Sequence, residues 1–349
     1  MSFQRIPTVI ATAIAAVMVF AAPLSASAQA PTKLKFTLDW RFEAPAAPFF
    51  LAQGKGYFDA EKIAVDINAG GGSGMTITRV ASGTYDMGFA DLAAVMEFLG
   101  NNPTAPQKPV GVMMIYNNAP AAIYSMKKSG ISKPEDLVGK KLGGPQFDAV
   151  RRAFPIFAKA NRLSGPIAWT TMDPSLRETM LVRGDVDAIS GFTFYTPQSL
   201  MARGAKAEDI VTMRYADYGV RLYGNAIIVN EAFAKKNPEV VKGALRAIAK
   251  GYRDAAKSPE EAVAYLKKRE PLIDEKLELS RMTALVNMVL MSPDSLAEGF
   301  GRVSPPRLSL MATQVSDAFE TKTRVDASKA FDASYLPAKE ELDFLKKTR

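Results

Sequence analysis

The chain has 349 residues, a formal net charge of +8, and neither histidine nor cysteine. The missing imidazole and thiol groups exclude histidine acid–base catalysis, thiolate nucleophiles, disulfides, and the nitrogen and sulfur ligands that zinc, copper and haem iron prefer. Hydrophobic residues make up 48% of the chain, enough for large cores, and the basic residues are scattered rather than clustered as nucleic-acid binding requires.

The first 30 residues have the pattern of an export signal. Arg5 is their only charged residue, an apolar run spans residues 9–20, and small residues follow up to Ala30. We predict a secretory signal peptide over residues 1–28, cleaved after Ala28. Because the chain has no cysteine for lipid attachment, we expect a periplasmic protein rather than a lipid-anchored one.

A proline-rich loop follows the first predicted strand of the mature chain. Residues 33–40 alternate charged and apolar side chains and then become apolar, which is typical of a strand entering a core. Pro45 and Pro48 prevent a longer strand and an early helical turn, so Trp40 and Arg41 lie in a strand-to-helix loop. Ligands bind at this edge of open α/β sheets, and we expect Trp40 to contact one. The alternative is that Trp40 plugs the core.

Helices and strands then alternate as in α/β proteins. The predicted helices of the first unit are 48–54, 75–82 and 91–99, and its further strands are 63–67, 85–90 and 110–116. A second unit repeats the plan, with strands 140–143, 167–172 and 186–190 and helices 149–162 and 174–183. The roughly 320 residues after the signal peptide suggest two domains.

The two units share one local detail. Gly83 ends a helix and Asp86 follows three residues later, just before a strand, while Gly184 and Asp187 repeat that spacing in the second unit. Two copies of this detail, each after the same order of elements, predict two similar lobes rather than one large sheet.

Strands that cross between the lobes complete the predicted organisation. We place a two-strand hinge at residues 119–126 and 221–229, because a few residues there can absorb a rotation. Lobe I then comprises residues 31–118 and 225–345, and lobe II comprises residues 119–224. Predicted helices at 240–256, 259–268, 277–291 and 308–319 pack around lobe I.

Polar and glycine-rich loops at strand ends are candidate ligand contacts. Gly72, Ser73 and Gly74 open a helix, where free backbone amides and a hydroxyl can hold an anionic or carbonyl oxygen; alternatively they form a flexible turn. Asp91 is more simply an N-cap than a ligand contact. Gln146 and Phe147 also follow a strand.

Aromatic and basic side chains provide further candidates. Phe192 and Tyr195 lie in a loop between Gly191 and Pro197, and with Trp40 they could form two walls of a slot for a flat molecule, or pack in the core. The arginines able to grip an acid group are Arg41, Arg151, Arg177 and Arg221. Each alone is more simply a solvated surface residue.

Four segments together resemble one protein family. They are Leu38-Asp-Trp40, Phe50-Leu-Ala-Gln53-Gly-Lys-Gly-Tyr-Phe58, Gly83-Thr-Tyr-Asp86 and Phe331-Asp-Ala-Ser-Tyr-Leu-Pro337. They resemble periplasmic solute-binding proteins of ABC importers for nitrate, sulfonates, taurine and pyrimidine precursors of thiamine. Leu-Asp-Trp resembles the pyrimidine-precursor branch most. The resemblance covers nearly all of the mature chain.

The resemblance implies a type II two-lobed α/β fold with the ligand between the lobes. Carried over by position, it places Trp40, Ser73, Gly74, Ala90, Tyr195 and Tyr223 at the ligand. The related eukaryotic pyrimidine synthase consumes one of its own histidines, and this chain has none, which argues against a synthase.

We therefore expect a monomeric binding protein, without cofactor or metal, that delivers a flat polar or anionic molecule to an inner-membrane ABC permease. The molecule would resemble a pyrimidine precursor or an aromatic acid. Alternative ligands are taurine, alkanesulfonates or nitrate. The alternative classes are a receptor-coupled sensor and an exported enzyme that uses carboxylates, for which Asp39 and Asp91 are the obvious pair.

Overall fold

A computed structural model describes residues 1, 2, 4 and 30–345 of the chain. The predicted signal peptide, residues 1–28, falls almost wholly outside the described residues. Within residues 30–345, none of the helices combines the length and apolar character needed to cross a membrane.

Two five-stranded mixed sheets form the framework. The strands of the first lie in the order β2-β1-β3-β10-β4, and β10 is antiparallel to both of its neighbours. Their bounds are β1 (Thr32–Thr37), β2 (Ile63–Asn68), β3 (Met87–Asp91), β4 (Pro109–Met114) and β10 (Asn225–Asn230). Elements around this sheet are called lobe I below.

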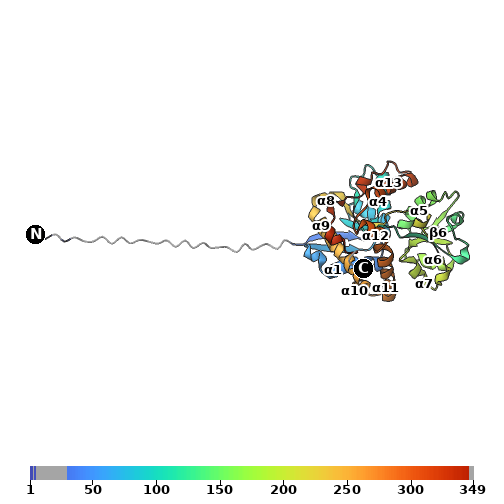
Figure 1. Ribbon diagram of the computed structural model, residues 1–349, viewed down its shortest axis with the longest axis horizontal. Helices are drawn as coiled ribbons and strands as arrows, with labels where there is room; N and C mark the ends of the chain where they lie inside the picture. Colours follow the sequence, from blue (N-terminus) through green and yellow to red (C-terminus); the bar gives the residue numbers. More distant parts are fainter. Residues whose placement is uncertain (3, 5–29, 346–349) are drawn as a thin grey trace. The chain divides into compact units, whose positions relative to one another are not determined.

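The second sheet repeats this topology in the order β7-β6-β8-β5-β9, with β5 antiparallel to both of its neighbours. Its strands are β5 (Ala121–Met126), β6 (Lys141–Gly143), β7 (Ala168–Thr170), β8 (Ala188–Phe192) and β9 (Ile210–Arg214). Elements around it are called lobe II, and in Figure 1 its green elements gather on one side of the described chain. The prediction of an α/β fold with two similar lobes is confirmed; the residue boundaries of the lobes stay a prediction.

Two chain segments connect the sheets, one between β4 and β5 and one between β9 and β10. They lie side by side, because the Ala119 amide donates to the Leu222 carbonyl and the Gly224 amide donates to the Tyr116 carbonyl. Residues 221–224 belong to the connection and not to a strand, so the predicted strand 221–229 is four residues too long at its start. The sequence does mark this start, since Gly224 and Asn225, residues typical of turns, separate residues 221–223 from the apolar run 226–229.

Helices cover both sheets. Those of lobe I before the first connection are α1 (Ala47–Gly54), α2 (Tyr57–Ala60), α3 (Ser73–Ala81) and α4 (Leu92–Asn101); those of lobe II are α5 (Ala149–Ala160), α6 (Arg177–Arg183) and α7 (Thr196–Met201). The last third adds α8 (Glu231–Lys236), α9 (Pro238–Lys257), α10 (Pro259–Arg269), α11 (Glu275–Leu285) with the π-helical turn η6 (Val286–Leu290), α12 (Pro293–Glu298), α13 (Pro305–Phe319), α14 (Ala327–Ala330) and α15 (Lys339–Leu342). As predicted, this region packs mainly on lobe I, where α9 packs against α1 and α2; Figure 1 shows α8 to α11 on the side of α1.

The repeated glycine–aspartate detail has the same structural role in both lobes. Asp86 exchanges hydrogen bonds with the Lys35 backbone, accepting from its amide through Oδ2 at 2.8 Å, and Asp187 does the same with Lys141. Each aspartate therefore ties the third strand of its unit to the first. Gly83 and Gly184 precede these aspartates with φ of 74° and 87°, which glycine adopts without strain.

The predicted start of the helix 174–183 is wrong. Pro174 and the predicted N-cap Asp173 lie in a separate turn, in which Asp173 accepts a hydrogen bond from the Ser175 amide. The helix α6 begins only at Arg177. An aspartate before a proline stabilises a turn as well as a helix start, so the pattern did not separate the two.

Candidate ligand site between the lobes

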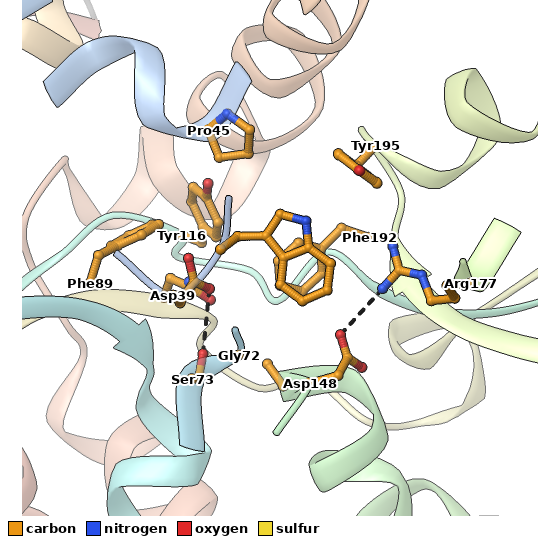
Figure 2. A pocket seen from close by; sticks show the side chains of 13 residues that line it. Asp39, Pro45, Gly72, Ser73, Phe89, Tyr116, Asp148, Arg177, Phe192 and Tyr195 are labelled. Carbon is orange, nitrogen blue, oxygen red and sulfur yellow. Dashed lines mark hydrogen bonds and ion pairs between the residues drawn. The ribbon is translucent and has the colours of Figure 1, made fainter. Parts of the chain in front are cut away.

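One cavity lies between the carboxyl ends of strands from both sheets (Figure 2). Lobe I lines it with residues that follow β1, open α3 or lie in β3 and β10, and lobe II with residues that open α5, α6 and α7 or end β8. The lining residues are Asp39, Trp40, Pro45, Gly72, Ser73, Phe89, Tyr116, Asn225, Asp148, Ala149, Arg177, Phe192 and Tyr195.

The loop after β1 is held against the start of α3. The Gly72 amide donates to the Asp39 carbonyl at 2.6 Å, and the Gly70 amide donates to the Trp40 carbonyl. A side chain at Gly70 would place its Cβ only 2.1 Å from the Leu38 carbonyl oxygen. The glycine run therefore allows two loops to touch and fixes Trp40 at the cavity.

A chain of hydrogen bonds organises the lobe I wall. Asp39 Oδ2 accepts from Asn225 Nδ2 at 2.6 Å and from Ser73 Oγ at 3.4 Å. Ser73 Oγ in turn accepts from the Asp91 amide at 3.0 Å. Burial raises the pKa of Asp39 to about 7, against the lowering effect of the Asn225 hydrogen bond.

Arg177 dominates the lobe II wall and is only 3% exposed. Its guanidinium donates through Nε and Nη2 to Glu178 Oε1 and through Nη1 to Asp148 Oδ2 at 3.4 Å. It also lies over the Trp40 ring, 5.2 Å from the centroid, which brings the two walls into contact. Cation–π contacts of this kind are favourable when desolvated.

A second set of contacts joins the lobes beside the cavity. The Tyr195 hydroxyl donates to Glu43 Oε2 at 2.8 Å, and burial raises its pKa to about 12, so it keeps its proton. Arg281 donates to Ser199 Oγ at 2.6 Å and lies 4.0 Å over the Tyr195 ring. Because these contacts cross between lobes, the structure is a closed arrangement.

The closed cavity is small. Its volume is about 30 Å³, whereas pockets for organic ligands usually hold about 300–1,000 Å³. A ring compound can therefore enter only if the lobes separate or the aromatic side chains rotate away.

Five of the predicted ligand residues share this cavity, namely Trp40, Gly72, Ser73, Phe192 and Tyr195. Of the four candidate arginines, only Arg177 lines it. Arg41 pairs with Glu43, Arg151 lies over Trp169, and Arg221 lines a separate groove beside the connections.

The remaining predicted residues lie elsewhere. Gly74 and Phe147 line another groove, and Gln146 lines a third. Ala90 is buried in β3, and Asp91 caps α4 by accepting from the Ala94 amide, as its simpler interpretation predicted. The Tyr223 hydroxyl donates to Glu298 Oε2 at 2.7 Å and accepts from the Ser304 amide, so it anchors the C-terminal region.

Sequence reasoning missed several lining residues. Phe89 and Asn225 lie within strands, where the sequence predicts core residues rather than ligand contacts, and Tyr116 lies in the first connection between the sheets. Asp148 does follow a glycine-rich loop, Gly143-Gly144, and this position before a helix was a usable signal.

The profile of the family described as NMT1/THI5 like matches residues 44–262, which is more than half of the chain. The chain belongs to the NMT1/THI5-like family. Its solved structural relatives include the alkanesulfonate-binding protein SsuA from Xanthomonas axonopodis pv. citri, with a TM-score of 0.67, 14% identity, and coverage of 86% of this chain and 98% of SsuA. At that identity, the likeness shows the periplasmic-binding-protein fold alone.

Two curated relatives of this NMT1/THI5-like chain have different names. The riboflavin-binding protein RibY of Chloroflexus aurantiacus is 27% identical over 248 residues, 69% of each chain. The 4-amino-5-hydroxymethyl-2-methylpyrimidine phosphate synthase of Aspergillus parasiticus is 25% identical over 232 residues, 62% of this chain and 64% of the synthase.

The NMT1/THI5-like site has a predicted pH signature. Because the folded pKa of Asp39 is raised to about 7, the native state keeps a proton that the unfolded state loses above pH 4. The retained proton stabilises the native state. Its contribution to the free energy of unfolding is fully present below pH 4 and is lost as the pH rises through about 7. The Asp39→Asn variant should therefore gain stability over wild type at pH 8, by up to about 4 kcal/mol, and much less at pH 4.

Urea unfolding at both pH values measures this difference, with Asp66→Asn, an exposed aspartate of β2, as the control. An equal effect of Asp39→Asn at both pH values would show that Asp39 is an ordinary ionised group.

Proposed function

We propose that this protein is the exported solute-binding component of an ABC importer, closing its lobes around a small flat organic molecule and passing it to an inner-membrane permease as a monomer. The observation that carries the proposal is the cavity lined by strand ends of both sheets, whose walls already touch through Arg177 and Trp40. The names of RibY and SsuA, both binding proteins of similar fold or sequence, support it.

The aromatic lining favours a ring. Trp40 lines the cavity from lobe I, and Phe192 and Tyr195 line it from lobe II. Phe89 and Tyr116 lie on the side of Asp39 (Figure 2). Stacking contributes about 1 kcal/mol per ring pair beyond burial. A ligand ring inserted between Arg177 and Trp40 would break their cation–π contact. It would gain two contacts instead, one with the guanidinium and one with the indole.

Taurine, an alkanesulfonate or nitrate is the alternative ligand, and the small cavity is the observation in its favour. The charges oppose it, since two carboxylates, Asp39 and Asp148, face one guanidinium that already bonds Glu178. An anion would meet no uncommitted cation there.

An enzyme is the alternative class, because some relatives are named as synthases. The chain contains no histidine, so it cannot donate one to a product as the synthase resemblance would require. The candidate acid pair is also occupied, Asp91 by the α4 cap and Asp39 by Asn225 and Ser73. Mass spectrometry of a bound compound after long incubation should recover it unchanged; a new product would reject this proposal.

A ligand screen tests the proposal. Riboflavin, 4-amino-5-hydroxymethyl-2-methylpyrimidine, benzoate, taurine and nitrate should be compared by thermal shift, and a ring compound should give the largest stabilisation. The stabilising compound should also change the fluorescence of Trp40, because Trp40 lines the cavity. Stabilisation by taurine or nitrate alone would reject the ring.

Single-tryptophan variants assign the signal, since the chain has only two tryptophans. Trp169→Phe should keep the response, because Trp169 lies in β7 against Arg151 and away from the cavity. Trp40→Phe should lose it and bind several-fold more weakly. A response that survives Trp40→Phe would place the ligand elsewhere.

A further inference from the structure

Asp39 is a buried carboxylate without a cationic partner. It is 6% exposed, and its side-chain hydrogen bonds come from two neutral groups, Asn225 Nδ2 and Ser73 Oγ. Among residues 30–345 it forms no ion pair, whereas Asp148, across the same cavity, pairs with Arg177. Burying an unpaired charge is costly, so such a group at a cavity wall indicates that a ligand supplies the missing partner.

A second acceptor stands beside Asp39. Asn225 donates through Nδ2 to Asp39 Oδ2, 2.6 Å away, which is the orientation that an ionised Asp39 requires because an amide oxygen there would face another acceptor. Its Oδ1 is consequently an acceptor, and it is fully buried with no hydrogen-bond partner. Asn225 lines the cavity, so a donor in the cavity can satisfy this oxygen.

Tyr116 is a second lining residue with an unpartnered polar atom. Its hydroxyl is buried without a partner, and the residue also lines the cavity. Buried polar groups in native proteins are nearly always hydrogen-bonded, so an orphan at the cavity wall calls for a ligand. The Asn225 oxygen, beside Asp39, meets this condition, whereas the Tyr116 hydroxyl points away from Asp39 in Figure 2. Figure 2 shows Asp39 and Tyr116 on the same side, away from Arg177.

The lobe II wall of the cavity does not supply a hydrogen-bond donor to these acceptors. Arg177 donates three hydrogen bonds, all to acids, two to Glu178 and one to Asp148. Asp148 accepts in addition from Ser190 Oγ and from the Arg151 amide, so its own lone pairs are largely used. The acceptors left open on the lobe I wall are therefore those of Asp39 and Asn225, while Arg177 on the opposite wall keeps two of its five N–H donors beyond these three bonds.

We propose that Asp39 and Asn225 select a solute that presents N–H donors on one edge of a flat ring, and that they reject a solute with an anionic group there. The inference rests on the proposed function, since it specifies the ligand of the same cavity. An amino-substituted or amidine-like nitrogen heterocycle has two N–H groups in one plane, which can reach a carboxylate and a neighbouring amide oxygen together. Buried acceptors of this kind discriminate strongly, because a ligand without donors leaves them unpaired.

Matched probes test the inference at pH 8, where Asp39 is ionised. The pairs are benzamidine with benzoate and 4-amino-2-methylpyrimidine with 2-methylpyrimidine, measured by calorimetry on the full mature chain. Wild type should bind the member with N–H donors at least about tenfold more tightly in each pair. In Asp39→Asn this ratio should fall at least about tenfold for benzamidine and benzoate, while in the control Asp66→Asn it should not change.

The outcomes separate the two proposals. If benzoate binds wild type as tightly as benzamidine, or if Asp39→Asn leaves the ratio unchanged, the donor selection is wrong while ring binding stands. If no ring compound binds and taurine or nitrate does, the proposed ring-binding function fails and the inference fails with it. The wild-type ratios decide the question even if the variant does not fold.

Discussion

Replacing Gly72 by alanine is expected to prevent full closure of the lobes and to weaken solute binding about tenfold to a hundredfold. In the closed arrangement an added Cβ would lie 2.2 Å from the Phe147 carbonyl oxygen of lobe II, and backbone atoms cannot give way as a flexible side chain can. Overpacking of this kind costs about 1–3 kcal/mol, which is one to two decades in affinity. Gly72 also has a φ of 127°, which a residue with a side chain rarely adopts.

The neighbouring glycine provides the control. An alanine at Gly71 would meet only the flexible end of Met75, at 3.1 Å, so Gly71→Ala should bind and close like wild type. Affinity and small-angle scattering of both variants, with and without the stabilising ring compound, measure the effect. Normal closure of Gly72→Ala would show that the approach of α3 to lobe II is not part of the bound state.

Replacing Arg177 by methionine is expected to destabilise the protein by about 3–5 kcal/mol. Glu178 is 1% exposed and Asp148 is 6% exposed, so removing the guanidinium leaves two buried acids without their cation. Breaking a buried ion pair from one side costs about this much, because the remaining charge stays desolvated. Urea unfolding of Arg177→Met measures the loss.

Two further variants test the cause. Arg183, in the same helix α6, pairs with Asp185 through a side chain that is 70% exposed, and Arg183→Met should cost at most about 1 kcal/mol. The double variant Arg177→Met with Glu178→Leu should recover much of the lost stability, since an apolar pair replaces the ion pair. A double variant as unstable as Arg177→Met alone would contradict the account.

Local sequence patterns predicted most of the framework because they act over a few residues. Glycine at a helix end and aspartate three residues later marked the same junction in both lobes, and both aspartates proved to bond the first strand of their repeated unit, β1 or β6. The N-cap Asp91 was found in the same way, whereas β1 ends at Thr37, three residues before the predicted end at residue 40. Edge strand β9 was missed because Ile210–Arg214 is short and half exposed, without the alternation of a predicted strand.

The site was predictable only where a residue followed a strand or opened a helix. Trp40, Ser73 and Tyr195 met that rule. Asn225 could not be recognised, because its partner Asp39 lies 186 residues away in the sequence. The contact of Arg281 with Ser199 likewise joins helices of different lobes, and Arg281 reads in the sequence as one more helical arginine.

Solution scattering tests the central claim most directly, namely that the protein closes its two lobes around a ring-shaped solute. The radius of gyration of wild type should be measured without ligand and with a saturating amount of the ring compound that stabilises it most. We predict a smaller radius with the ligand, because the closed state bound across both walls is favoured. An unchanged scattering profile at saturation would contradict closure and the role assigned to the cavity.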